Sequence, residues 1–128
     1  GAQWSQIAVG SFACGIQTDK SLRCWGDNFE SAPVAPHWQP AMVGSLYDWK
    51  EVAVGYGFAC AIKDSDDALY CFGANGYGRL GLGLDDQDVR ENPVLVDDTR
   101  QYKSIGTGSN HACAISTGGE LFCWGLCF

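Results

Sequence analysis

A cysteine hairpin that occurs three times constrains this chain more than any other feature. It reads FACGIQTDKSLRCWG at 12–26, FACAIKDSDDALYCFG at 58–73 and HACAISTGGELFCWG at 111–125. The first cysteines of the copies stand at positions 14, 60 and 113, so the repeat spacing is 46 residues and then 53 residues. Spacings of this size are typical of β-propeller blades, each of which is one small antiparallel sheet. The sequence therefore predicts a repeat protein built from such sheets.

The numbering places the two cysteines of each hairpin opposite one another. Pairing them centres the three hairpins on Asp19, between Ser65 and Asp66, and on Gly118, which are all turn-forming residues. Directly opposed residues of antiparallel strands are close enough for a disulfide. Three bonds are expected: Cys14–Cys24, Cys60–Cys71 and Cys113–Cys123. Zinc is the competing explanation, but zinc sites usually contain C-x2–4-C pairs, whereas nine or ten residues separate these cysteines.

Alternation of side chains makes both faces of each hairpin apolar. In the second copy, one face carries Phe58, Cys60 and Ile62, while the other sets Ala59 against Phe72. The other two copies repeat the arrangement of small residues opposite large aromatic residues. A sheet with two apolar faces belongs between two other sheets, as a blade does in a propeller.

Each repeat also opens with a short apolar strand that ends in glycine. The three segments are WSQIAVG at 4–10, WKEVAVG at 49–55 and YKSIGTG at 102–108. The expected organisation is one continuous domain with a first repeat at 1–48, a second at 49–101 and a partial third at 102–128. Because propellers close with about 4–8 blades, we expect an all-β fold of two and a half to three antiparallel blades. Other chains or a missing segment would complete the ring.

The segment after the second hairpin gives the repeat its family resemblance. It runs GANGYGRLGLG at 73–83 and reaches PVLV at 93–96. Together with the strands before it, this succession resembles the repeat of the regulator-of-chromosome-condensation family, which implies blades of a seven-bladed β-propeller. The cysteine pairs resemble those of secreted members, including bacterial surface proteins and crinkly-type plant receptor ectodomains. The first repeat departs from the pattern, since FESAPVAPHWQPAMVGSLYD at 29–48 replaces the glycine-rich turn.

Residues outside the repeat are the candidates for function, because residue types that recur at equivalent positions serve the shared framework. Exposed loop aromatic residues are common anchors in binding surfaces. The candidate partner contacts are Phe29, His37, Trp38, Tyr47, Tyr56 and Tyr77. Trp38 could instead simply cover the hydrophobic edge of the first blade. The recurring aromatic residues and His111, which replaces Phe58 of the second copy, are interpreted as framework. Cys127, the seventh cysteine, could form an interchain bond, pair with a missing segment or remain a free thiol.

Composition and motifs argue against several classes of function. The chain has 8 Lys and Arg residues against 15 Asp and Glu residues, and its net charge of −7 disfavours binding to nucleic acid or anionic membranes. The sequence contains no apolar run of 18 residues, so membrane insertion is not expected. No nucleophile elbow, phosphate loop or HExxH motif occurs, so neither catalysis nor a cofactor is expected. Calcium at the acidic loops stays an alternative; the residues in question are Asp64, Asp66, Asp67, Asp85, Asp86, Asp88 and Glu91.

The leading hypothesis from the sequence is a non-catalytic, secreted or cell-surface protein that uses its blades for contact with a protein partner or for self-association. The cysteine pairs support this hypothesis because disulfides persist in oxidising compartments. The alternative is a secreted enzyme inhibitor or a ligand-binding, lectin-like propeller. A third function, nucleotide exchange on a small GTPase, is implied by the nuclear namesake of the family. The acidity of the chain and its paired cysteines disfavour that third function.

Overall fold

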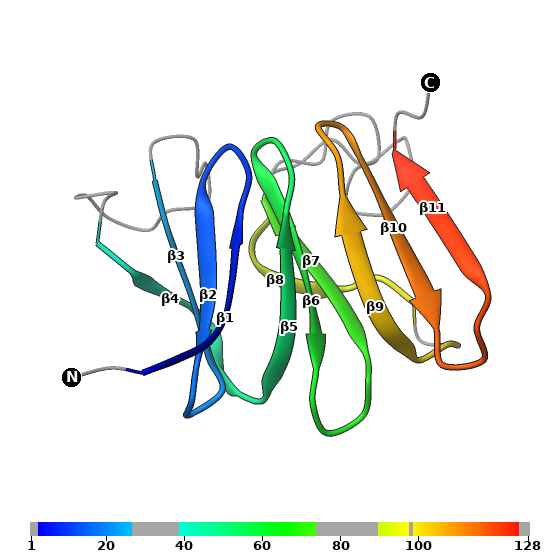
Figure 1. Ribbon diagram of the computed structural model, residues 1–128, viewed down its shortest axis with the longest axis horizontal. Coiled ribbons are helices and arrows are strands. Elements are labelled where there is room, and N and C mark those ends of the chain that lie inside the picture. Colours follow the sequence, from blue (N-terminus) through cyan, green and yellow to red (C-terminus); the bar gives the residue numbers. More distant parts are fainter. Residues whose placement is uncertain (1–2, 27–38, 74–89, 98, 126–128) are drawn as a thin grey trace.

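The computed structural model describes residues 3–26, 39–73, 90–97 and 99–125, and these ranges form three antiparallel sheets side by side (Figure 1). The first sheet contains β1 (Trp4–Val9), β2 (Ala13–Gln17), β3 (Ser21–Trp25) and β4 (Ala41–Tyr47). The second contains β5 (Trp49–Val54), β6 (Phe58–Lys63), β7 (Leu69–Gly73) and β8 (Arg90–Leu95). The third contains β9 (Tyr102–Thr107), β10 (His111–Ser116) and β11 (Leu121–Gly125). The expected all-β fold, an open and partial propeller, is confirmed.

Each blade contains the cysteine hairpin in the register that the numbering predicts. Cys60 lies directly opposite Cys71, and the two other pairs are opposed in the same way. The structure contains all three intrablade disulfides: Cys14–Cys24, Cys60–Cys71 and Cys113–Cys123. Lys20 and Asp67 take left-handed φ values of 69° and 58° beside the first two turns. Each hairpin is therefore closed by a disulfide near one end and by a tight turn at the other.

The hydrophobic core consists of two layers, each between neighbouring blades. In each layer, the face that carries isoleucine, leucine and the disulfide packs against the small and aromatic residues of the next blade. Between the first two blades, Cys14 and Leu22 belong to one buried cluster with Val52 and Phe72. The layer between the second and third blades includes Cys60, Leu69, Tyr102 and Ala112. The β6–β7 hairpin is consequently buried on both faces, as its sequence predicts.

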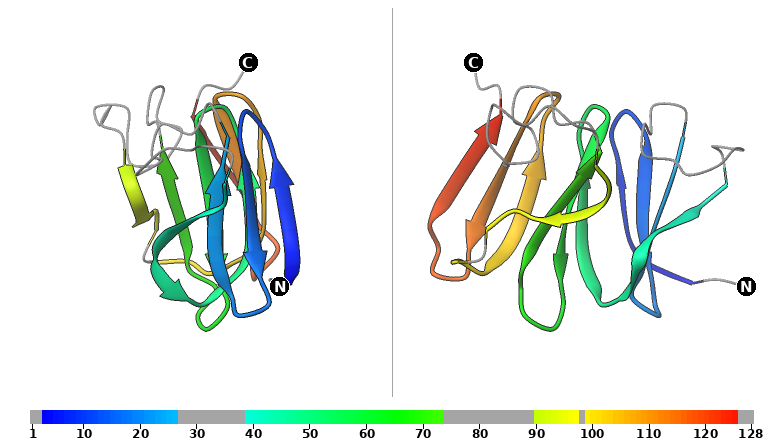
Figure 2. Two further views of the ribbon diagram at one scale, coloured as in Figure 1. Left: turned by 90° about the vertical axis from the view of Figure 1, so that its left-hand side faces the viewer. Right: turned by 180° about the vertical axis from the view of Figure 1, so that it is seen from behind.

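Strands β1, β5 and β9 form one edge of each sheet, away from β4 and β8, and are called the inner strands (Figure 2). The turns that follow them, called the inner turns, connect the blades through backbone hydrogen bonds. The Ser11 amide donates to the Gly55 carbonyl at 3.1 Å, and the Tyr56 amide donates to the Ser109 carbonyl at 3.2 Å. Gln6 acts as a side-chain bridge, since it accepts from the Val52 amide at 2.7 Å and donates to the Val52 carbonyl at 2.9 Å. These bonds satisfy backbone groups that lie outside any one sheet's ladder.

Glycine is required where one inner turn approaches the next blade. A Cβ atom on Gly10 would lie 2.6 Å from the Val54 carbonyl oxygen. A Cβ atom on Gly55 would lie 2.2 Å from Cε1 of Phe58 and 2.6 Å from the Gly108 carbonyl oxygen. A real Cβ atom cannot occupy such a position without moving the backbone of the neighbouring blade. Glycine at positions 10 and 55 is therefore a condition for blade docking.

We expect Gly55→Ala to destabilise the protein by about 1–3 kcal/mol, the usual cost of forcing an extra methyl group into a packed interior. Gly106→Ala is the matched control, because a Cβ atom at Gly106 meets no atom within 4 Å. Urea unfolding of both variants measures the difference. Equal free energies of unfolding for the two variants would contradict this account of the inner turns.

Candidate protein-contact site

Two of the aromatic residues predicted to contact a partner lie in the described part of the chain. Tyr47 ends β4 and Tyr56 lies in the turn between β5 and β6. Both are exposed, at 56% and 57%. Tyr47 belongs to the first blade and Tyr56 to the second, and β5 runs between them, so the two residues lie at opposite ends of the blades and do not share one contact. The other predicted residues lie outside the described residues: Phe29, His37, Trp38, Tyr77 and Cys127.

Tyr56 borders an open groove formed where the inner turns of all three blades converge. We call it the inner-turn groove; its lining residues are Val9, Gly10, Ser11, Val54, Gly55, Tyr56, Thr107, Gly108 and Ser109. Val9 beside it is 74% exposed. The Ser11 hydroxyl accepts from the Gly57 amide at 2.8 Å, and the Thr107 hydroxyl donates to the Val54 carbonyl at 2.7 Å. The groove thus combines a fixed backbone with exposed apolar side chains.

His111 forms part of the support beneath this groove. Its Cε1 atom lies 2.4 Å from the position that a Cβ atom on Gly108 would occupy. In the second blade, Cε1 of Phe58 lies 2.2 Å from the position that a Cβ atom on Gly55 would occupy. The imidazole therefore takes the place of a framework phenyl ring beneath an inner turn. This placement agrees with the interpretation of His111 as a framework residue.

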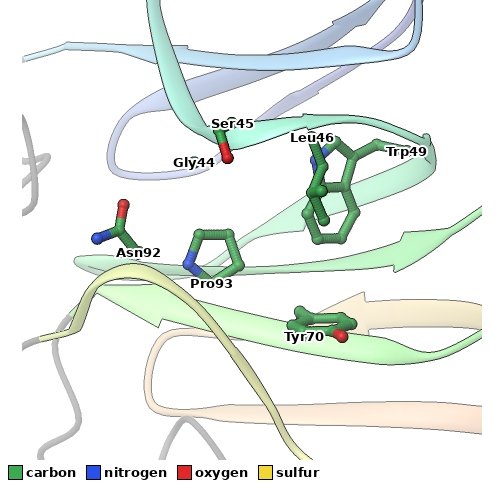
Figure 3. A pocket seen from close by; sticks show the side chains of 7 residues that line it. All are labelled: Gly44, Ser45, Leu46, Trp49, Tyr70, Asn92 and Pro93. Carbon is green, nitrogen blue, oxygen red and sulfur yellow. The ribbon is translucent and has the colours of Figure 1, made fainter.

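A second concavity lies on the outer side of the first two blades. We call it the outer pocket; its lining residues are Gly44, Ser45, Leu46, Trp49, Tyr70, Asn92 and Pro93 (Figure 3). Strands β4 and β8 supply its two sides, and β5 and β7 supply the aromatic residues. The Trp49 and Tyr70 rings meet edge to face with centroids 5.5 Å apart. Nothing in the repeat pattern marks this pocket, because its lining combines two different repeats.

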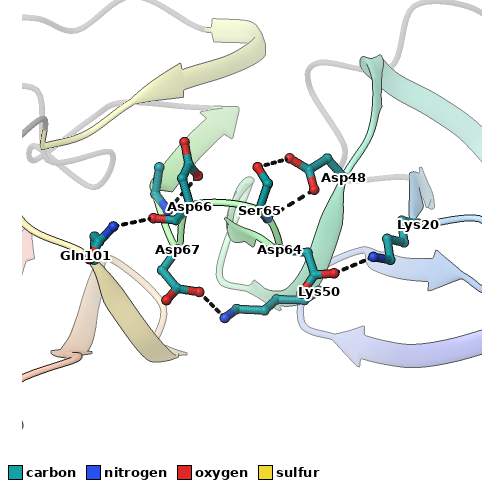
Figure 4. A network of polar contacts seen from close by, with 9 residues as sticks. Lys20, Asp48, Lys50, Asp64, Ser65, Asp66, Asp67 and Gln101 are labelled. Atoms are coloured by element: carbon teal, nitrogen blue, oxygen red, sulfur yellow. Dashed lines mark hydrogen bonds and ion pairs between the residues drawn. The ribbon is translucent and has the colours of Figure 1, made fainter.

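At the opposite end from Tyr56, the acidic turn of the second blade connects all three blades (Figure 4). Asp64 pairs with Lys20 of the first blade, and the Asp66 carbonyl accepts from the Gln101 amide at 3.0 Å. Asp67 pairs with Lys50. The hydrogen bond from Lys20 lowers the pKa of Asp64. The Asp64 and Asp67 carboxylates of this turn therefore have cationic partners on the protein surface.

The acidic residues of the described chain do not assemble a metal centre. Within the described ranges, no group of three or more His, Cys, Asp or Glu side chains could hold a metal ion. The calcium alternative at Asp85, Asp86 and Asp88 lies outside the described residues. That alternative therefore stays untested.

The sequence did not predict a carboxylate–phenol pair that forms at the start of β9. The Tyr102 hydroxyl donates to Asp97 at 2.9 Å, and the Thr99 hydroxyl and amide donate to the same carboxylate at 2.6 and 2.8 Å. The Thr99 hydrogen bonds hold the pKa of Asp97 well below its usual range. Arg100 donates to Asp97 at 3.0 Å and lies 4.2 Å above the centroid of the Phe122 ring. The pattern Asp-x-Thr before β9 could have indicated this arrangement, because an Asp side chain often hydrogen-bonds to the backbone two residues further on.

Burial raises the pKa of Tyr102 to about 12. The neutral phenol therefore stabilises the fold fully below the unfolded pKa of about 10, and this stabilisation is lost as the pH rises towards 12. We expect the free energy of unfolding to fall across that window and to fall less steeply in Tyr102→Phe. Urea unfolding at several pH values from 9 to 12 measures both slopes. Identical slopes would show that Tyr102 does not carry the effect.

The fold is an open, partial propeller of disulfide-closed blades. Comparison with known proteins identifies its repeats. Residues 49–79 and 102–126 match the family model described as "Regulator of chromosome condensation (RCC1) repeat". The chain therefore contains RCC1-type repeats. The two matched ranges fall in the second and third predicted repeats and cover part of each.

The relatives and solved structures agree with this repeat type. The protein named "Probable E3 ubiquitin-protein ligase HERC4" of Mus musculus is 31% identical over 90 residues, which are 67% of this chain and 8% of that protein. The structure of yeast RCC1 (Prp20) bound to Kap60 has a TM-score of 0.77 at 23% identity, over 94% of this chain and 29% of that one. The ectodomain of the receptor kinase CR4 from Physcomitrella patens has a TM-score of 0.64 at 17% identity, over 97% and 30%.

This chain is short beside its relatives. It spans between 4% and 15% of the length of the curated proteins it matches. The similarity therefore concerns the repeats and not the other parts of those proteins. No helix in the described part of the chain is long and apolar enough to cross a membrane.

Proposed function

We propose that this chain is a non-catalytic, extracellular protein-interaction module whose main contact surface is the inner-turn groove. The observation that carries the proposal is the exposed Tyr56 on a turn that hydrogen bonds to both neighbouring blades hold in place. Ser11 bonds to Gly55 on one side, and Tyr56 bonds through its amide to Ser109 on the other. An exposed aromatic side chain on a rigid backbone binds at a low cost in conformational entropy.

The repeat type supports a protein partner over other ligands. In the yeast RCC1 structure, Kap60 is the protein bound to RCC1. The groove itself is formed largely from backbone and small side chains, with Val9 and Tyr56 as its exposed apolar residues. Aromatic residues such as Tyr are enriched in the hot spots of protein interfaces. The net charge of −7 favours a partner with a neutral or basic contact surface.

The disulfides support the extracellular part of the proposal. Bonds such as Cys60–Cys71 form and persist in oxidising compartments and are rare in the cytosol. The CR4 ectodomain shares this fold, which is therefore compatible with a place outside the cell. The intracellular relatives share the repeat, so the cysteine pairs rather than the fold carry this inference.

The test compares Tyr56→Ala with Tyr47→Ala in the full chain. The two tyrosines have nearly equal exposure and lie at opposite ends of the blades, so Tyr47→Ala is a matched control. A photoreactive residue at Ser109 would crosslink the partner on intact cells that display it. We expect Tyr56→Ala to lower the crosslinked yield at least tenfold, while Tyr47→Ala leaves it unchanged and both variants keep the melting temperature. Equal yields from both variants would rule out the inner-turn groove as the contact.

A further inference from the structure

The Trp49 side chain contains a buried hydrogen-bond donor without an acceptor. The residue is 1% exposed, and its Nε1 atom has no partner in the described part of the chain. Buried side-chain donors almost always have a partner in native proteins. In Figure 3 the indole nitrogen lies at the end of the ring nearest β4, beside Leu46. The unpaired donor therefore belongs to a residue that lines the outer pocket.

The third blade shows what the missing acceptor would be. Met42 pairs with Arg23 in the first blade, and Leu95 pairs with Tyr70 at the equivalent place in the second. Gly44 and Asp97 correspond in sequence, because each stands five residues before the first aromatic residue of the next inner strand, Trp49 or Tyr102. The β3–β4 register is irregular beyond Met42, so this correspondence rests on the spacing. At these positions the third blade has a donor and its acceptor, since the Tyr102 hydroxyl donates to Asp97 at 2.9 Å.

The second blade has the donor without that acceptor. Glycine occupies position 44, and it has no side chain that could accept the indole N–H. The vacated space is open, because the outer pocket measures about 470 Å³. This volume lies within the range of small-ligand pockets, roughly 300–1,000 Å³. The pocket therefore joins an unpaired donor to a space large enough for a ligand that supplies the acceptor.

The lining residues decide the chemistry of that ligand. Its polar donors are neutral: the Trp49 indole, the Ser45 hydroxyl and the Asn92 amide. Among the described residues that line the outer pocket none is cationic, which disfavours a carboxylate or phosphate as the acceptor. Leu46 and Pro93 form apolar walls. A neutral carbonyl oxygen next to an apolar group meets all of these conditions.

A peptide fits this site better than a sugar. Sugar binding usually needs the open face of an aromatic ring, and the Trp49 ring is buried against Tyr70. We propose that the outer pocket binds an extended apolar peptide segment of a protein partner, whose backbone carbonyl accepts from Nε1 of Trp49. Leu46, which is 42% exposed, can change its rotamer to admit that carbonyl. The apolar side chain of the segment then packs against Pro93.

This site is separate from the proposed contact in the inner-turn groove. The groove is lined by the inner turns, whereas the outer pocket is lined mainly by β4 and β8. The inference adds a second peptide site to the proposed function and does not depend on Tyr56. Loss of partner capture in Tyr56→Ala and binding of a peptide at Trp49 can therefore be measured independently.

The experiment follows the indole N–H signal of Trp49 by ¹⁵N NMR in the full chain. The probe is acetyl-Ala-Leu-Ala-amide at concentrations up to about 10 mM, and N-acetylglucosamine is the competing probe. We expect the peptide to move the Trp49 signal downfield to saturation, with little effect from the sugar. Absence of a shift at the highest peptide concentration would overturn the proposal. An equal or larger response to the sugar would do the same.

Two substitutions test the mechanism of binding. Gly44→Asp places a carboxylate where the third blade has Asp97, and Asp tolerates the φ of 68° at this position better than most residues do. Its Cβ atom would meet Pro93 at 3.4 Å, an ordinary contact. We expect the Trp49 signal to move without peptide and the peptide dissociation constant to rise at least tenfold. Unchanged peptide binding in this variant would contradict the proposed acceptor.

Gly118→Asp is the matched control, because it adds the same charge at an exposed turn where a Cβ atom meets only Ser116, at 3.8 Å. It should bind the peptide as the unmodified chain does. Asn92→Ala is a second, surface-exposed test that removes one neutral donor without adding a charge. It should weaken peptide binding at least fivefold even if Gly44→Asp does not fold. Full affinity in Asn92→Ala would contradict the assigned role of the pocket donors.

Discussion

This structure depends on one kind of contact. The disulfide face of each blade packs against the face of small and aromatic residues on the next blade. Cys14 and Cys24 are fully buried in the first of these layers, and Cys60 and Cys71 in the second. The cystine therefore has two roles, since it closes a hairpin of about ten residues and also fills the space between blades. Reduction would loosen both the hairpin and its docking surface. Disulfides of this loop size stabilise a fold by roughly 2–3 kcal/mol in the chain-entropy model.

The surfaces that can contact a partner are those that this packing leaves exposed. The blades bury the recurring residues, so the exposed features are the inner turns at one end, the hairpin turns at the other and the outer pocket at the side. The hairpin end is connected by ion pairs such as Lys20–Asp64, which are exposed and individually worth about 0–1 kcal/mol. The inner-turn groove and the outer pocket retain exposed apolar side chains, and Trp49 of the outer pocket also has an unpaired indole N–H. These two surfaces are where a partner would gain most from contact.

The sequence was sufficient for the fold because the fold repeats. The opposed cysteines predicted the hairpin register. The apolar residues on both faces, with Cys60 on one and Ala59 opposite Phe72 on the other, predicted that both faces are buried. The contacts between blades could not be predicted in the same way, since each joins residues about 45 positions apart that no local pattern connects. The Gln6 bridge to Val52 is of this kind. The Asp97–Tyr102 pair is local in sequence, and the unpaired indole of Trp49 has no acceptor, but neither feature recurs in the described parts of the other repeats. These features depend on positions at which two repeats have different residues, whereas the repeat pattern shows only positions at which the repeats have similar residues.

The disulfides connect the packing to the proposed extracellular setting, so their state in the protein from its natural source is the decisive measurement. Mass spectrometry of unreduced, alkylated peptides would report each pairing directly. The account predicts three crosslinked peptides, joining Cys14 to Cys24, Cys60 to Cys71 and Cys113 to Cys123, with no alkylation at these six positions. Alkylation of most of the six cysteines without prior reduction would contradict both the stapled blades and the extracellular assignment.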